Sequence, residues 1–236
     1  GFGGHFHNDN SVAALRDIPG LVIASPARGD DAVKMMRTCM ALAKVDGRVV
    51  TFLEPIALYM AKDLHESGDN AWCFPYPPPG EAIRLGEGYV YEPDARDLTI
   101  LSWSNGLYLS LRAGRTLARQ HGIRARVVDL RWLNPLNEPF IIEQSAATGR
   151  VLIVDEGRRT GGVSEAIMAV LLERGRREWS VQRLTALDTY IPLGAAALKV
   201  LPSEDDILSA ARRLLSSGSR SQATRARSAP RPAKFR

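Results

Sequence analysis

The sequence predicts an α/β protein with a mostly parallel sheet flanked by helices. Short runs rich in Val, Ile and Leu alternate with longer amphipathic segments along most of the 236 residues. The short runs are almost continuously apolar, which is typical of strands buried on both faces of a parallel sheet. Regular alternation of such strands with helices favours a layered α/β architecture.

The position of each element follows from its pattern. The expected strands are Leu21–Ala24, Val49–Leu53, Leu98–Trp103, Ala125–Leu130, Val151–Asp155 and Val181–Leu184. The expected helices are Asp30–Val45, Asn105–His121, Pro139–Thr148, Gly161–Arg174 and Ser203–Leu215. Gly122 is placed to end one helix as a left-handed cap. Ser203 is placed to cap the start of another helix, and the acidic residues that follow it interact favourably with the helix dipole.

The alternation breaks once, at residues 74–80, which read Phe-Pro-Tyr-Pro-Pro-Pro-Gly. Such a run permits neither a helix nor a central strand, so we predict an interdomain linker over residues 66–96. Residues 1–65 hold only two strands and one helix, too few for a self-sufficient domain, and are interpreted as the C-terminal half of one. Residues 97–215 are predicted to form a complete domain. With Gly1 rather than Met at the start, this predicts a piece of a longer polypeptide.

Charge is concentrated at the C-terminus. The formal net charge of +5 is more than accounted for by six cations after residue 215: Arg220, Arg225, Arg227, Arg231, Lys234 and Arg236. The rest of the chain is nearly neutral, which argues against a specific nucleic-acid-binding surface on the folded body. Residues 216–236 are too poor in large apolar side chains to fold alone, and we predict a disordered basic tail.

The overall composition is that of an ordinary globular protein, with 45% hydrophobic and 24% charged residues. No run approaches the ~18 apolar residues of a membrane span. Two cysteines, Cys39 and Cys73, are too few for a disulfide framework and fit a reducing compartment. We therefore expect a cytoplasmic protein.

The densest polar cluster is the segment from His5 to Asn10, which contains His7 and Asp9. It allows three interpretations: metal ligation by two histidines and an acid, capping of a helix over Val12–Arg16 by Asn10 or Ser11, or a catalytic histidine on a glycine-flanked loop. Spacing alone favours the capping interpretation.

A second polar segment, from Arg158 to Gly162, follows an expected strand and opens an expected helix. Its glycines and arginines allow anion binding or close helix packing, and packing is favoured. It matches neither the dinucleotide nor the P-loop fingerprint. Glu54, Asp155 and Glu156 lie where α/β sheets place functional groups, at the ends of strands. The chain has no Gly-x-Ser-x-Gly nucleophile elbow, which argues against an α/β-hydrolase.

Several motifs in order resemble the beta subunit of thiamine-dependent 2-oxo acid dehydrogenases. The N-terminal motifs are Gly3–Ser11, Ile18-Pro19-Gly20-Leu21 and Phe52-Leu53-Glu54-Pro55 with Leu58-Tyr59. The later motifs resemble the transketolase C-terminal domain: Leu98–Leu101, Val128–Arg131, Val154–Glu156, Thr160–Gly162, Thr189–Pro192 and Asp205–Leu215. The resemblance implies a partial transketolase-like pyrimidine-binding domain followed by a complete transketolase C-terminal domain.

The resemblance also implies a function: oxidative decarboxylation of a 2-oxo acid with acyl transfer to lipoamide. His7, by its position relative to Pro19, falls at the family's active-site histidine. Asp46 is a loose candidate for a monovalent cation site. The family's Gly-Asp-Gly…Asn site for Mg²⁺ and diphosphate is absent, so thiamine diphosphate would be held mainly by residues outside this chain.

The implied partners are an alpha subunit or a fused alpha region, a second beta copy and a lipoyl acyltransferase core. The isolated chain is expected to be inactive. The alternatives are a transketolase-type transferase and a non-catalytic dimerisation and docking module.

Overall fold

The larger of two sheets in the computed structural model carries the C-terminal part of the chain. The structure describes the backbone of residues 12–227 and the side chains of residues 12–216. The sheet has the order β3-β5-β4-β7-β8. Its parallel strands are β4 (Leu98–Ser102), β5 (Ala125–Asp129), β7 (Arg150–Arg158) and β8 (Ser180–Ala186). The edge strand β3 (Tyr89–Tyr91) runs antiparallel to β5.

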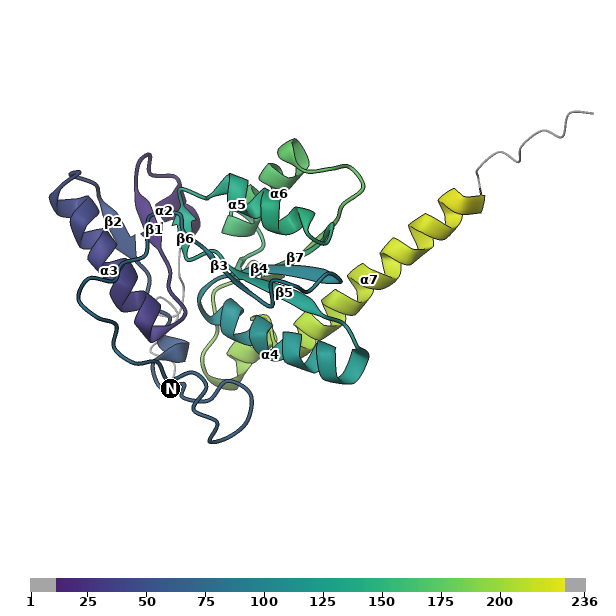
Figure 1. The fold of residues 1–236 in the computed structure, drawn as a ribbon, viewed down its shortest axis with the longest axis horizontal. Helices are drawn as coiled ribbons and strands as arrows, with labels where there is room; N and C mark the ends of the chain where they lie inside the picture. Colours follow the sequence, from purple (N-terminus) through teal and green to yellow (C-terminus); the bar gives the residue numbers. More distant parts are fainter. Residues whose placement is uncertain (1–11, 228–236) are drawn as a thin grey trace, which may run out of the picture.

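Helices cover both faces of this sheet (Figure 1). One face carries α4 (Ser104–His121) and the first part of α7 (Glu204–Arg227), and the other carries α5 (Glu138–Ala146) and α6 (Val163–Arg174). Alternate residues of the central strand β4 point to opposite layers: Ile100 packs toward α4 and α7, and Leu101 toward α6. This two-sided burial explains the continuous apolar runs in the sequence. A short 3₁₀ helix, η2 (Gly194–Lys199), precedes α7.

A second, smaller sheet carries the N-terminal part of the chain. Its order is β2-β1-β6, with β1 (Val22–Ala24) parallel to β2 (Val50–Phe52). The third strand, β6 (Trp132–Asn134), comes from the C-terminal half of the sequence and runs antiparallel to β1. The helix α3 (Gly29–Lys44) packs on this sheet through Met35 and Cys39. The short helices α2 (Val12–Arg16) and η1 (Ile56–Leu58) complete this part.

The predicted α/β class, the six strands and the five helices are confirmed, with boundaries shifted by up to a few residues except at the end of the last helix. Two strands were missed. β6 was missed because it is three residues long and follows β5 after two residues. β3 lies inside the predicted linker, so that interval contributes a strand to the C-terminal sheet.

The remaining part of the predicted linker is irregular but packed. Trp72 and Ile83 are buried, and the Trp72 ring lies edge-on to Tyr108 of α4 with 5.1 Å between centroids. Arg37 of α3 donates hydrogen bonds to the carbonyls of Pro77 and Glu81, at 3.0 and 2.8 Å, and to that of Pro78. The segment is therefore packed against the helices α3 and α4.

The helix caps predicted at Gly122 and Ser203 are observed. Gly122 ends α4 with φ +64°, and the Ser203 hydroxyl accepts a 3.2 Å hydrogen bond from the Asp206 amide at the start of α7. The predicted end of this last helix at Leu215 is wrong, because α7 continues to Arg227 and leaves the body of the molecule (Figure 1). Within residues 12–227, no helix is long and apolar enough to cross a membrane.

Candidate functional site

The predicted catalytic residue His7 and its neighbour His5 lie outside the described residues, as do the predicted caps Asn10 and Ser11. The description begins at α2, which directly follows this segment. Val12, at the start of α2, is 7% exposed and packs in the core shared with α6. The place where the histidine segment joins the fold is therefore defined, although the histidines themselves are not described.

The helix α2 is attached to the turn between β7 and α6. Arg16 Nη1 donates a 2.9 Å hydrogen bond to the carbonyl of Gly162. Gly161 has φ +75°, and a Cβ added there would lie 3.3 Å from the Ala13 Cβ. A Cβ at Gly162 would lie 2.8 Å from the Arg158 carbonyl oxygen. The two glycines therefore permit a tight turn and close approach of α2, as the packing interpretation predicts.

The start of α6 is already occupied by carboxylates of this chain. Asp155 Oδ2 accepts a 3.0 Å hydrogen bond from the Ser164 amide, and Glu165 Oε2 accepts one of 2.9 Å from the Gly161 amide. These bonds satisfy donors that an external anion would use. The structure thus gives no support to the anion interpretation of the Arg158–Gly162 segment.

A small cleft of about 30 Å³ lies between α2 and this turn. We call it the α2 cleft; it is lined by Val12, Ala13, Trp103, Asp155, Gly157, Arg158, Thr160, Gly162 and Val163. Its volume is that of about one water molecule. The α2 cleft by itself is therefore too small to hold an organic substrate.

Two carboxylates at the end of β7 have raised pKa values. Burial raises the pKa of Asp155, although its Oδ1 accepts a 2.7 Å hydrogen bond from the Gly157 amide. Glu156 keeps some exposed surface, yet dense protein surroundings raise its pKa to about 7. Asn105 Nδ2 donates to Glu156 Oε1 at 2.5 Å. A carboxyl group with a pKa near neutrality can hold or release a proton at physiological pH.

The N-terminal part is joined to the C-terminal sheet by a buried charge cluster. Arg131, just after β5, donates to Asp31 Oδ2 of α3 from Nε at 3.0 Å and from Nη2 at 2.6 Å. Asp129 Oδ1 accepts a 3.0 Å hydrogen bond from the Arg131 amide. All three side chains are at most 5% exposed. Burial raises the pKa of Asp129 to about 7.

The backbone of Arg131 has φ +58°, a left-handed conformation that costs energy for a non-glycine residue. A second link between the two parts is the 2.5 Å hydrogen bond between the hydroxyls of Ser25 and Ser104. Sequence reasoning did not assign Asp31, Ser25 or Ser104 to any site. The only feature of the sequence that pointed to this cluster was the position of a charged residue, Arg131, at the end of a buried strand.

Beside α3 lies a larger groove of about 450 Å³. Its wall includes Phe52, Glu54 and Tyr59 of the predicted motif, together with Met36 and Tyr76. Glu54 Oε2 accepts a 2.5 Å hydrogen bond from the Tyr59 hydroxyl, and this bond raises the pKa of Tyr59. The groove therefore combines apolar side chains with one carboxylate, Glu54, and two guanidinium groups, those of Arg28 and Arg37.

Asp46, the predicted cation ligand, is exposed just beyond the end of α3. Within the described part of the chain, no three His, Cys, Asp or Glu side chains are grouped closely enough to hold a metal ion. A role for Asp46 in metal binding therefore stays a prediction. The Gly-Asp-Gly…Asn motif for Mg²⁺ and diphosphate is absent from the sequence, so the residues that would hold that half of a thiamine diphosphate site are expected outside this chain.

Fold and site together define a class: an α/β protein in which a small three-stranded sheet is attached to a larger, mostly parallel C-terminal sheet flanked by helices. Residues 87–207, about half of the chain, match the family model "Transketolase, C-terminal domain". The chain belongs to this family. The match begins at residue 87 and so includes β3, ahead of the predicted domain start at residue 97.

Curated relatives extend the similarity beyond that domain. The chain is 30% identical over 211 residues to "Pyruvate dehydrogenase E1 component subunit beta" of Bacillus subtilis, covering 89% of this chain and 60% of that protein. It is 28% identical to "2-oxoisovalerate dehydrogenase subunit beta, mitochondrial" of Dictyostelium discoideum, covering 82% and 49%. It is 29% identical to "1-deoxy-D-xylulose-5-phosphate synthase" of Desulfitobacterium hafniense, covering 81% and 27%.

A solved structure shows the same fold. It is described as "Split gene transketolase, inactive beta4 tetramer" and matches with a TM-score of 0.68 and 24% identity, over 90% of this chain and 63% of that one. The predicted resemblance to the C-terminal portion of a 2-oxo acid dehydrogenase beta subunit is confirmed. The chain spans 60% or less of the length of these curated relatives.

Proposed function

We propose that this chain is the C-terminal portion of the decarboxylating component of a 2-oxo acid dehydrogenase complex. That component would decarboxylate a 2-oxo acid with thiamine diphosphate and pass the acyl group to lipoamide. The observation that carries the proposal is the similarity to dehydrogenase beta subunits over 89% of this chain, which includes the N-terminal part as well as the C-terminal domain.

The attachment of α2 supports a catalytic role for His7. Arg16 and Val12 hold the start of the described chain against the β7–α6 turn, beside Asp155. Loops that are attached to fixed elements of an α/β fold often carry catalytic side chains. Imidazole titrates near pH 6.5, so His7 would hold or donate a proton at neutral pH while the acyl group is transferred.

The cofactor would be shared with residues outside this chain. The sequence lacks the Gly-Asp-Gly…Asn motif for Mg²⁺ and diphosphate, and among residues 12–216 no three His, Cys, Asp or Glu side chains are grouped closely enough to hold a metal ion. When bound, thiamine diphosphate would supply the carbanion chemistry of decarboxylation. The partners that this proposal requires are an alpha subunit or fused alpha region, a second beta copy and a lipoyl acyltransferase core. We expect such a complex in the cytoplasm, and we expect the isolated chain to be inactive.

The test is the substitution His7→Ala in the complete enzyme with its lipoyl partner. A positioned acid–base group contributes about 10²–10⁴ in rate, so lipoamide acylation should fall by about that factor while assembly and melting temperature stay nearly unchanged. His5→Ala is the matched control and should have much less effect. Near-normal turnover in His7→Ala would refute the catalytic assignment.

A second candidate is a transketolase-type transferase, which the similarity to the synthase from Desulfitobacterium hafniense supports. The two functions differ in the acceptor of the carbon fragment. An assay of 2-oxo acid decarboxylation with lipoamide against ketol transfer to an aldose separates them. Activity in neither assay, with retained self-association, would favour the dimerisation and docking module.

A further inference from the structure

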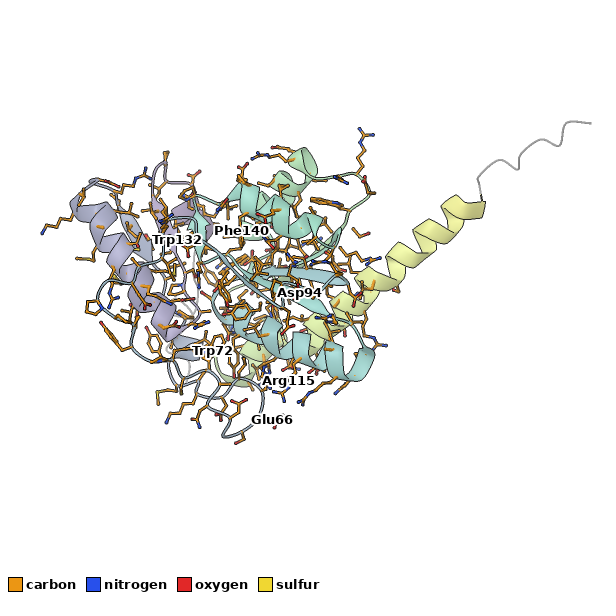
Figure 2. All side chains as sticks on the ribbon, viewed as in Figure 1. Glu66, Trp72, Asp94, Arg115, Trp132 and Phe140 are labelled. Carbon is orange, nitrogen blue, oxygen red and sulfur yellow. The ribbon has the colours of Figure 1, made fainter. Side chains whose placement is uncertain are left out.

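A surface cavity of about 150 Å³ lies on the α4 and α7 side of the C-terminal sheet. Three elements that are distant in sequence meet around it: the loop of residues 63–71, the middle of α4 and the first residue of α7. Figure 2 shows Glu66 and Arg115 on the loop and on α4 at this place. The cavity is separate from the α2 cleft, with no lining residue in common.

The loop is held in shape by two of its own carboxylates. The Asp69 side chain accepts hydrogen bonds of 2.8–3.0 Å from the amides of residues 64, 65, 66 and 71. These hydrogen bonds, that from the Ala71 amide first, hold the pKa of Asp69 well below its usual range. Asp63 accepts two further bonds, from the Gly68 and Asn70 amides. The loop is thus ordered without a ligand.

The same loop is fixed onto α4. The Tyr108 hydroxyl donates to the carbonyl of Asp63 at 2.5 Å, and Arg112 Nη1 donates to that of Leu64 at 2.7 Å. Residues 65 and 66 are therefore carried on a rigid support and held next to the helix. A preorganised wall of this kind lowers the entropy cost of binding a ligand.

Positive charge exceeds negative charge in this cavity. Arg112, Arg115 and Arg119 line it at positions i, i+3 and i+7 of α4. Arg112 is paired with Glu204 at 2.9 Å, but Arg115 and Arg119 both contact a single oxygen, Oε1 of Glu66. Three guanidinium groups therefore face two carboxylates.

Two further observations concern the side chains of residues 65 and 66. The pKa of His65 is lowered, first by burial and then by the charge of Arg115. The Glu66 side chain is 64% exposed, so it can swing into solvent and leave both arginines free. The cavity volume of about 150 Å³ is large enough to accommodate a phosphate group.

We infer that this cavity is a binding site for a phosphate group, which takes the place of the Glu66 carboxylate between Arg115 and Arg119. Guanidinium groups match the geometry of phosphate oxygens through paired N–H donors. A phosphate carries more negative charge than the carboxylate that it replaces, so it neutralises the cavity more completely. The site goes beyond the proposed function and does not depend on it.

The experiment measures the binding of inorganic phosphate, and separately of glycerol phosphate, to the 236-residue chain. Calorimetry and thermal shift are the two readouts, and sodium chloride at equal ionic strength is the reference. Replacing both arginines (Arg115→Gln with Arg119→Gln) should weaken binding by about tenfold or more, since each removes a charge-assisted hydrogen bond. Glu66→Gln should strengthen it severalfold, because the competing carboxylate charge is lost.

The matched control is Arg174→Gln, which removes an arginine that is paired with Glu138 on the opposite side of the sheet. It should leave phosphate affinity unchanged. Binding of inorganic phosphate alone would identify a site for the free ion, and binding of glycerol phosphate as well would extend the site to phosphomonoesters. An equal response to phosphate and chloride, or no gain with Glu66→Gln, would overturn the inference.

Discussion

Arg131 donates two hydrogen bonds to one oxygen of Asp31, across the boundary between the two parts of the chain. The donors are Nε at 3.0 Å and Nη2 at 2.6 Å, and both side chains are at most 5% exposed. Asp31 lies in the first turn of α3, whereas Arg131 follows β5. The pair therefore fixes the helix that covers the small sheet to the end of the large one.

Removal of one partner of this pair should be costly. In Asp31→Ala the Arg131 guanidinium stays buried but loses the carboxylate that balances its charge. We therefore expect the free energy of unfolding to fall by about 3–5 kcal/mol. Urea unfolding followed by circular dichroism measures it. The control is Glu138→Ala, whose pair with Arg174 is about half exposed and should contribute less than about 1 kcal/mol. Equal losses in the two variants would show that burial does not make the Asp31–Arg131 pair more important for stability than the exposed pair.

Asp129 should make stability depend on pH. Burial raises its pKa to about 7, against an ordinary value of 3.8. Between these two pH values the unfolded chain releases the proton while the folded protein keeps it, so this contribution to stability is complete below about pH 4 and is lost as pH rises toward 7.

Asp129→Asn isolates this effect, because asparagine keeps a side-chain oxygen for the Arg131 amide and does not titrate. The difference in unfolding free energy between the wild type and this variant should fall steadily from pH 4.5 to 7.5. Carboxylates with lowered pKa values, such as Asp30, act in the opposite direction but are present in both proteins. Parallel stability curves would show that Asp129 keeps an ordinary pKa in the folded protein.

Gly162 should not tolerate alanine. A Cβ there would lie 2.8 Å from the Arg158 carbonyl oxygen and 2.9 Å from Asp155 Oδ2, so the turn before α6 would have to shift. We expect Gly162→Ala to lower the melting temperature by several degrees, as overpacking usually costs about 1–3 kcal/mol.

The control for this substitution is Gly29→Ala at the first residue of α3, where no atom lies within 4 Å of the added Cβ. That change should leave stability unchanged or raise it by up to about 1 kcal/mol. A melting temperature for Gly162→Ala at or above that of Gly29→Ala would contradict the steric account.

Arg37 should protect the proline-rich segment from proteolysis. Its guanidinium donates to three carbonyls between Pro77 and Glu81, so Arg37→Ala should release this stretch and increase cleavage within residues 74–81. Limited proteolysis with mass spectrometry locates the cut. Lys44→Ala, at the last residue of the same helix, should leave the pattern unchanged. Resistance equal to the wild type in Arg37→Ala would mean that these hydrogen bonds do not hold the segment.

The sequence predicted best what depends on local pattern. The buried strands around Ile100 and Ile153 were found because they are apolar on both faces, and α4 ends where Gly122 was expected to end it. Strands β3 and β6 were missed because three residues carry too little pattern, and both are defined by antiparallel pairing with distant segments. The pairing of Asp31 with Arg131 could not be predicted, since it joins residues 100 positions apart through tertiary packing.

The strand β6 has a consequence for how this domain could be exchanged between proteins. It lies inside the family match at residues 87–207, yet it completes the sheet that contains β1 and β2. A gene rearrangement that moved residues 87–207 into another protein would also remove an edge strand from the N-terminal sheet and expose the backbone of β1. The N-terminal part and residues 87–207 are therefore expected to be inherited together. The reason is that β6, in the second of these, pairs through its backbone with β1 in the first.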